Sequence, residues 1–191
     1  MKFALPLKSC PDSSAFTLIE LLIVISIIAT LMGIGSQVAR IAMQRARVAQ
    51  AKVQITTLKN AMRSYQSEYG SFPVDSGDEH QTEGLVMQAL MGGEDQAAEL
   101  LNPRGIVFFT TGRQASRPNA PGFVTKLHRL NDPWGTPFEF TIDVGGSGKV
   151  MLPSPYHDTY GPSLPGVRVF IHSAGPDRKL ETTEDNVHQL Q

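Results

Sequence analysis

A single carboxylate within an apolar run is the residue whose type and position most need a chemical explanation. Phe16 to Gly35 (FTLIELLIVISIIATLMGIG) form a run of 20 residues with one charge, Glu20. A carboxylate costs about 2.5–3.5 kcal/mol at the centre of a bilayer, less toward its edge, and is usually paired. Two explanations remain open from the residues alone. Glu20 could pair with a new α-amino group at Phe16, one helical turn away, if the chain were cut after Ala15. It could instead lie in the membrane interface and hydrogen-bond water.

A second group of carboxylates lies near the C-terminus, in residues 173–187 (SAGPDRKLETTEDNV). Calcium ions take roughly six to eight oxygen ligands, many of them carboxylates. The spacing is not that of an EF-hand loop, because the third and twelfth positions counted from the first acid are Lys179 and His188. The segment is therefore either a cation site or a solvated acidic tail. Its four acids are Asp177, Glu181, Glu184 and Asp185.

No arrangement typical of catalysis is evident. The sequence contains no nucleophile elbow, no phosphate-binding glycine loop and no Cys-His pair, and Cys10 is its single cysteine. The formal net charge of −1 gives no reason to expect nucleic acid as a partner. We therefore expect a protein that is not an enzyme. The five histidines are scattered, with no pair at metal-ligand spacing: His80, His128, His157, His172 and His188.

The element expected to carry Glu20 is one long helix. No proline occurs between Phe16 and Gly70, and good helix formers dominate residues 37–69. Gly70 is a stop signal, so the sequence predicts a helix of about 54 residues, roughly 80 Å long. Its apolar first half is long enough to cross the hydrocarbon core of a membrane. In its second half, apolar residues recur at steps of three and four and predict a buried stripe: Ile55, Leu58, Met62, Tyr65 and Tyr69.

After the helix, the chain reads as short extended runs separated by turns. Runs of β-branched and aromatic residues predict strands, and two shorter stretches predict helices. Strands that follow one long helix imply an antiparallel sheet packed on that helix, which is an α+β fold. The expected strands are 106–111 (IVFFTT), 123–127 (weaker), 138–142 and 167–172, and the expected short helices are 83–91 and 94–101.

The string A-FTLIELLIVISIIATLMGIG resembles the processing and anchor segment of type IV prepilins and type II secretion pseudopilins. The resemblance implies that a prepilin peptidase cuts between Ala15 and Phe16, that Phe16 becomes N-methylated, and that Glu20 is needed for assembly. Ala15 departs from the glycine that is usual before the cut, and we expect cleavage to be slower for that reason.

Two further motifs resemble the major pseudopilin. The string DPWGTPFEF, with Asp132, Pro133, Trp134 and Gly135, is similar to an element that precedes a strand of its sheet. The C-terminal acidic segment is similar to its calcium loop, which implies calcium as a cofactor, with Ser173, Asp177, Glu184 and Asp185 as ligands. Glu184 stands in place of an aspartate, and Arg178 and Glu181 stand where glycine is common.

These resemblances imply a structural subunit of a type II secretion pseudopilus in the bacterial inner membrane. The expected organisation is a leader (1–15), a transmembrane assembly helix (16–36), the extracytoplasmic half of the same helix (37–70) and a globular head (71–191). The expected partners are the prepilin peptidase, other copies of the chain, other pseudopilins, an inner-membrane assembly platform and membrane lipid, with no nucleic acid. The head of this single-pass protein would be periplasmic.

The basic residues on either side of the apolar run favour the opposite membrane orientation. The cluster that follows the apolar run is larger than the pair before it, Lys2 and Lys8, so the positive-inside rule alone favours a cytoplasmic C-terminal side. Long domains translocate largely regardless of charge, and we therefore follow the resemblance. Two alternatives remain: a type IV pilin or minor pilin for adhesion, motility or DNA uptake, and a monomeric membrane-tethered binding domain. The basic cluster comprises Arg40, Arg45, Arg47 and Lys52.

Overall fold

The structure is a computed structural model that describes residues 16–74, 76–93 and 95–189, and within residues 34–36 it describes the backbone only. The predicted leader, with Ala15 of the predicted cleavage site, lies outside the described residues. The chain divides into two units, Met1–Met43 and Gln44–Gln191, and each is considered by itself.

Helix α1 (Leu18–Tyr69) has 52 residues and confirms the predicted long helix. It ends where the sequence places a glycine: Gly70 adopts φ 75°, a left-handed conformation that favours glycine after a helix. The Gly70 N–H donates to the carbonyl of Gln66 at 2.8 Å, which satisfies one of the last free carbonyls of the helix.

The first unit consists, in its described part, of the apolar beginning of α1. Every side chain from Phe16 to Gly33 is exposed in the structure of the single chain. The helix is long and apolar enough to cross a membrane, by length and composition. An apolar surface that is exposed on all sides of a helix indicates burial against lipid or other chains.

The second unit contains a four-stranded sheet in which all neighbouring strands are antiparallel. The sheet order is β1–β4–β7–β8, so its neighbours come from distant parts of the chain. Predicted strands 138–142 and 167–172 correspond to β4 and β7, and the α+β fold is confirmed. The strand bounds are β1 His80–Gln81, β4 Glu139–Ile142, β7 Val169–Ser173 and β8 Val187–His188.

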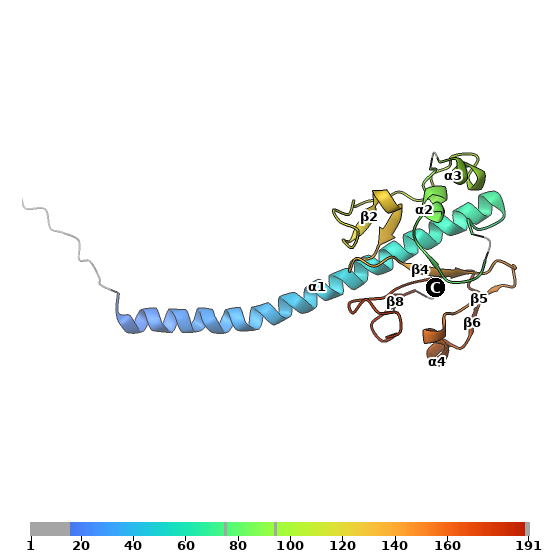
Figure 1. Ribbon diagram of the computed structural model, residues 1–191. Coiled ribbons are helices and arrows are strands. Elements are labelled where there is room, and N and C mark those ends of the chain that lie inside the picture. The colour runs from blue at the N-terminus through green and yellow to red at the C-terminus, as the bar shows by residue number, and fades with distance from the viewer. Residues whose placement is uncertain (1–15, 75, 94, 190–191) are drawn as a thin grey trace, which may run out of the picture. The chain divides into compact units, whose positions relative to one another are not determined.

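The two faces of this sheet are covered differently. One face packs on the second half of α1, where Ile55, Leu58, Met62 and Tyr65 of the predicted stripe are buried. Figure 1 shows the β5–β6 hairpin and α4 beyond the other face of the sheet. Burial of each large side chain in such a core contributes about 1.5–3 kcal/mol, so the helix stripe is a main source of stability.

The cover of that second face is built from β5 (Lys149–Met151), 3₁₀ helix η2 (Ser154–Tyr156), α4 (His157–Tyr160) and β6 (Ser163–Pro165). It forms a small second core from Val150, Leu152, Tyr156 and Phe170. The remaining elements are α2 (Leu85–Leu90), α3 (Gln96–Leu101), β2 (Gly122–Val124), 3₁₀ helix η1 (Thr125–Leu127) and β3 (Arg129–Asn131).

The predicted strand 106–111 was wrong. Its backbone forms no strand, and the N–H groups of Phe108 and Phe109 both donate to the carbonyl of Leu90 at 2.9 Å. The Phe108 ring packs against the rings of Tyr65 and Tyr69 on α1. The apolar run therefore reflects burial against helices rather than pairing within a sheet, and periodicity alone does not separate these cases.

The weaker predicted strand, 123–127, was right only in its first half. Strand β2 stops at Val124, and the following residues form η1. His128 then takes a left-handed conformation with φ 44°, which turns the chain into β3. Strands β1, β3, β5, β6 and β8 have two or three residues each, too few to give a periodic signal.

Candidate functional site

Glu20 lies at the beginning of α1 and closes a capping box with Thr17. The Thr17 N–H donates to the Glu20 carboxylate at 2.9 Å, and the Thr17 hydroxyl donates to it at 2.7 Å. The Glu20 N–H in turn approaches the Thr17 hydroxyl oxygen at 3.3 Å. These bonds satisfy donors that every helix start leaves free. The carboxylate is thus stabilised within its own chain, next to Phe16, whose exposed fraction is 78%.

Sequence reasoning assigned Glu20 to assembly but missed this local role. The signal is present in the sequence, because Thr17-Leu18-Ile19-Glu20 has the T-x-x-E spacing of a capping box before an apolar run. The two roles are compatible. A carboxylate held by its own helix start remains exposed and can accept a further cationic partner.

Asp132 of the DPWG turn is fully buried and holds two segments together. One carboxylate oxygen accepts the N–H groups of Trp134 and Thr136, each at 2.9 Å. The other accepts the Thr136 hydroxyl at 2.7 Å and the Ser173 hydroxyl, at the end of β7, at 2.5 Å. Because a buried carboxylate needs such donors, this turn and the end of β7 depend on each other.

Gly135 of the same turn must be a glycine. Its φ is 92°, in the region that side chains rarely adopt, and an added Cβ would clash with the carbonyl oxygen of Asn119. The DPWG turn is therefore a structural element that packs against the 119–120 backbone, with Trp134 buried beneath it.

The acidic loop after β7 forms a hollow of about 550 Å³. Asp177 and Asp185 are neighbours in its lining, since the Asp177 N–H approaches the Asp185 carboxylate at 3.4 Å. Hydrogen bonds from Thr182, then from the Lys179 N–H, hold the pKa of Asp177 below its ordinary value. The hollow is lined by Asp177, Glu181, Thr182, Thr183, Glu184 and Asp185.

The structure brings together three of the four predicted calcium ligands. Asp177, Glu184 and Asp185 line the hollow, whereas the Ser173 hydroxyl is buried and donates to Asp132. The Ser173 oxygen also accepts the Gly175 N–H at 3.1 Å, so both of its hydrogen bonds are made outside the hollow. The donor set that remains consists of carboxylates and threonine hydroxyls, which suits a hard cation such as calcium.

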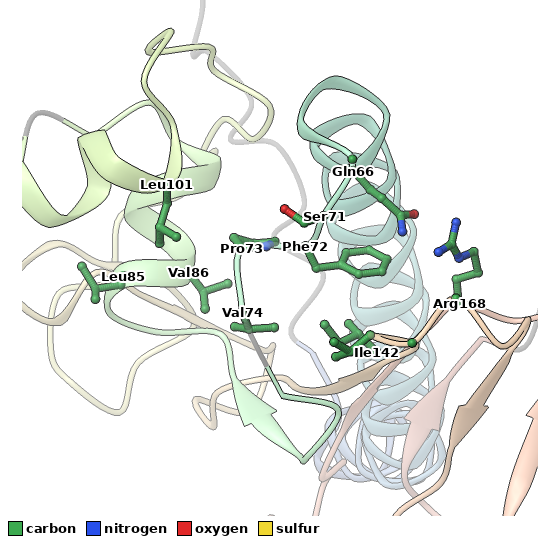
Figure 2. A pocket seen from close by; sticks show the side chains of 14 residues that line it. Gln66, Ser71, Phe72, Pro73, Val74, Leu85, Val86, Leu101, Ile142 and Arg168 are labelled. Atoms are coloured by element: carbon green, nitrogen blue, oxygen red, sulfur yellow. The ribbon is translucent and has the colours of Figure 1, made fainter.

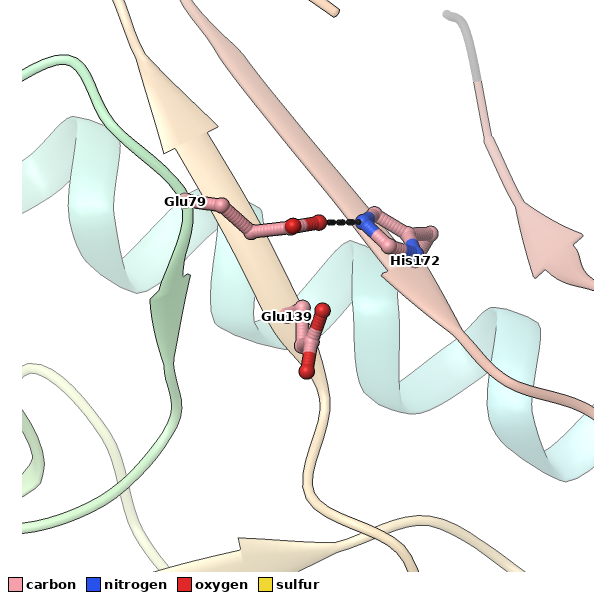
Figure 3. Close-up of side chains that lie close together, drawn as sticks. All are labelled: Glu79, Glu139 and His172. Atoms are coloured by element: carbon pink, nitrogen blue, oxygen red, sulfur yellow. Dashed lines mark hydrogen bonds and ion pairs between the residues drawn. The ribbon is translucent and has the colours of Figure 1, made fainter. Parts of the chain in front are cut away.

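A third group combines two carboxylates with an imidazole on the sheet. Within the described ranges, Glu79, Glu139 and His172 are the acids and histidine whose ligand atoms all lie within 4.8 Å of one another. The Glu79 carboxylate and His172 Nε2 are 2.8 Å apart, and Gln81 donates to the Glu139 carboxylate at 3.0 Å. Figure 3 shows the Glu79 side chain reaching across β4 to His172.

The electrostatics of this group reflect burial. Burial and, to a smaller extent, the nearby Glu79 carboxylate raise the pKa of Glu139 to about 7, against the lowering effect of the hydrogen bond from Gln81. The hydrogen bond with His172 lowers the pKa of Glu79. Sequence reasoning missed this group because its members are far apart in the chain: Glu79 and His172 are separated by 93 positions.

A hollow of about 870 Å³ lies where α1 ends. Its lining is largely apolar and includes Phe72, Val86 and Ile142, with the Arg168 guanidinium 6.0 Å from the centre of the Phe72 ring. Figure 2 shows Arg168 beside Phe72 and Gln66. The described lining contains no group of acids, histidines or cysteines.

Comparison with known proteins identifies the N-terminal segment. Residues 11–36 match the family described as the prokaryotic N-terminal methylation motif. The chain therefore carries a type IV prepilin-like signal, and the match includes Phe16 and Glu20. A search of curated proteins and a search of solved structures each gave no significant match.

Proposed function

We propose that this chain is a structural subunit of a type II secretion pseudopilus, which polymerises through its N-terminal helix to drive protein export. The observation that carries the proposal is the methylation motif over 11–36, joined to a helix whose apolar side chains are all exposed from Phe16 to Gly33. A helix of this kind needs lipid before assembly and neighbouring helices after it. Outside lipid this surface would face water, so packing against neighbouring helices stabilises the chain in the assembled filament.

In this proposal a prepilin peptidase cuts between Ala15 and Phe16, and Phe16 is methylated. The chain stays in the inner membrane with residues 37–191 in the periplasm until an assembly platform adds it to copies of itself and to other pseudopilins. The DPWG turn and the acidic loop support a secretion pseudopilin. The methylation motif is equally compatible with a type IV pilin, so restoration of secretion, rather than of adhesion or motility, in a strain lacking its own major pseudopilin separates the two.

Glu20→Gln is expected to leave peptidase cleavage unchanged and to reduce filament assembly by about tenfold or more. The carboxylate would pair with the cationic α-amino group of Phe16 on a neighbouring subunit, and in low dielectric such a pair is worth more than the 1.4 kcal/mol that a tenfold change requires. The measurement is intact mass with the peptidase present, together with the pelletable filament fraction.

Thr17→Val is the matched control. Glutamine at position 20 keeps the capping box and removes the charge of the carboxylate, whereas valine at position 17 disrupts the capping box and leaves the Glu20 charge in place. We expect Thr17→Val to assemble nearly as well as the unchanged chain. Assembly that tolerates Glu20→Gln but fails in Thr17→Val would mean that Glu20 acts only by capping its helix. A chain that still begins at Met1 after exposure to the peptidase would contradict the proposed processing.

The acidic loop would hold a calcium ion in this protein, bound by Asp177, Glu184 and Asp185 with the adjoining threonines. The ion would neutralise carboxylates that otherwise repel one another and would join the two sides of the loop. Ser173 has a separate role, since its hydroxyl is bonded to Asp132.

Calcium is therefore expected to raise the melting temperature of the full chain in detergent micelles. At about 100 times the dissociation constant the gain is about 2.7 kcal/mol, which corresponds to roughly 5–10 °C. Asp185→Asn should remove most of this shift, and Asp158→Asn, at an exposed site elsewhere, should keep it. Ser173→Ala should lower the melting temperature without changing the shift. An equal calcium shift in Asp185→Asn would rule out this loop.

A further inference from the structure

One row of side chains crosses the sheet on the face turned away from α1. The strand register pairs Gln81 with Glu139, Glu139 with His172, and His172 with His188. Directly paired residues point to the same face of a sheet, and Glu79, two positions before Gln81, shares that face. The tertiary structure thus places metal-binding side chains from four separate segments side by side.

The row is buried at its centre and open to solvent at the end that carries Glu79 and Gln81. Glu139 and His172 are buried, with the ring of Tyr156 centred 5.0 Å from that of His172. Glu79 lies at the surface, its side chain 37% exposed. An ion therefore has a route from solvent to two buried ligands.

The buried polar atoms on this face that have no hydrogen-bond partner among the described residues include Nδ1 of His172 and Nδ1 of His188. The hydroxyl of Thr141, which lies two residues after Glu139 and hence on the same face, is a further one. Unsatisfied buried polar atoms are costly, and these atoms show that the packing on this face leaves polar groups without protein partners. The buried Glu139 carboxylate accepts a hydrogen bond from the uncharged amide of Gln81 and lies beside the second carboxylate, Glu79.

We propose that Glu79, Glu139 and His172 bind a zinc ion. Zinc takes imidazole nitrogen and carboxylate oxygen at about 2.0–2.2 Å, and three protein ligands with a water complete its usual tetrahedral set. Two ligands of one tetrahedral ion lie roughly 3.3 Å apart, close to the 2.8 Å between Glu79 and His172 Nε2. The ion replaces the proton between these two atoms and neutralises the buried Glu139 carboxylate. The imidazole ligand favours zinc over calcium.

The ion would join the segment before β1 to β4 and β7, which are far apart in the chain. It would act as a cross-link in a protein whose single cysteine allows no internal disulfide. This inference does not depend on the proposed secretion role, and it concerns a site distinct from the acidic loop.

The test uses the full chain in detergent micelles, freed of metal by a chelator and titrated with zinc chloride by calorimetry. We expect one zinc ion per chain and a rise in the melting temperature. Cobalt chloride, added in parallel, should give the visible absorption of tetrahedral cobalt, which reports coordination directly. Absence of saturable zinc binding would overturn the proposal and leave a proton as the occupant of the site.

Glu139→Gln and Glu79→Gln should each weaken zinc binding by about 100-fold or more, since even a residue that merely orients a ligand is worth about 10- to 100-fold. Glu79→Gln guards against misfolding, because Glu79 is at the surface. Glu83→Gln and His128→Asn are the matched controls away from the row and should bind zinc as the unchanged chain does. Asp185→Asn should also leave zinc binding unchanged. Equal affinity in all variants would place the zinc elsewhere and overturn the assignment.

Discussion

Replacing Asp132 with alanine is expected to lower the free energy of unfolding by about 3 kcal/mol or more. The buried carboxylate accepts hydrogen bonds from two backbone N–H groups and two hydroxyls, including that of Ser173. Hydrogen bonds to a charged group contribute about 1.5–3 kcal/mol, and the buried donors of Trp134 and Thr136 would be left without a partner. Urea unfolding in detergent micelles measures the loss, with fluorescence of Trp134, the single tryptophan, as the signal.

Asp158→Ala is the control for this experiment, since it removes an exposed carboxylate and should change stability by no more than about 0.5 kcal/mol. Ser173→Ala removes only the bond between the turn and β7, so its loss in the free energy of unfolding should lie between those of Asp132→Ala and Asp158→Ala. If Asp132→Ala unfolds at the same urea concentration as Asp158→Ala, Asp132 does not hold the turn to the sheet.

The second large effect is expected at Leu58, in the half of α1 that belongs to residues 44–191. Its side chain is 0% exposed within the main core, so Leu58→Ala removes buried methyl groups and leaves a cavity. Substitutions of this kind cost about 2–5 kcal/mol. The same fluorescence-detected unfolding would measure the loss, and the position of the transition is the readout.

Val53→Ala is the matched control on the same helix, because its side chain is 66% exposed and alanine favours the helix. We expect this change to be neutral within about 0.5 kcal/mol. Equal effects at Leu58 and Val53 would show that the second half of α1 is not part of the core, contrary to the packing described above.

The long helix could be predicted because its signals are local. The absence of proline, the stop at Gly70 and apolar residues at steps of three and four all act within a few turns, and the structure follows them. The same holds for the two strands with the richest apolar content, β4 and β7. The predicted strand 106–111 had similar content and is not a strand, because the N–H groups of Phe108 and Phe109 bond to the carbonyl of Leu90 instead of to another strand. The apolar composition of a segment indicates that it is buried, whereas its pairing into a sheet depends on which other segment lies beside it in the fold.

The sequence by itself determined the apolar N-terminal helix, the methylation motif with Phe16 and Glu20, the α+β class and the DPWG turn. Each depends on residues close together in the chain. Only the tertiary structure showed that Ser173 bonds to Asp132 rather than lining the acidic loop, and that Glu79, Glu139 and His172 lie together on one face of the sheet. Those contacts depend on the sheet order β1–β4–β7–β8 and on its register. Residues 93 positions apart meet there because the strands between them pair, which no local spacing encodes.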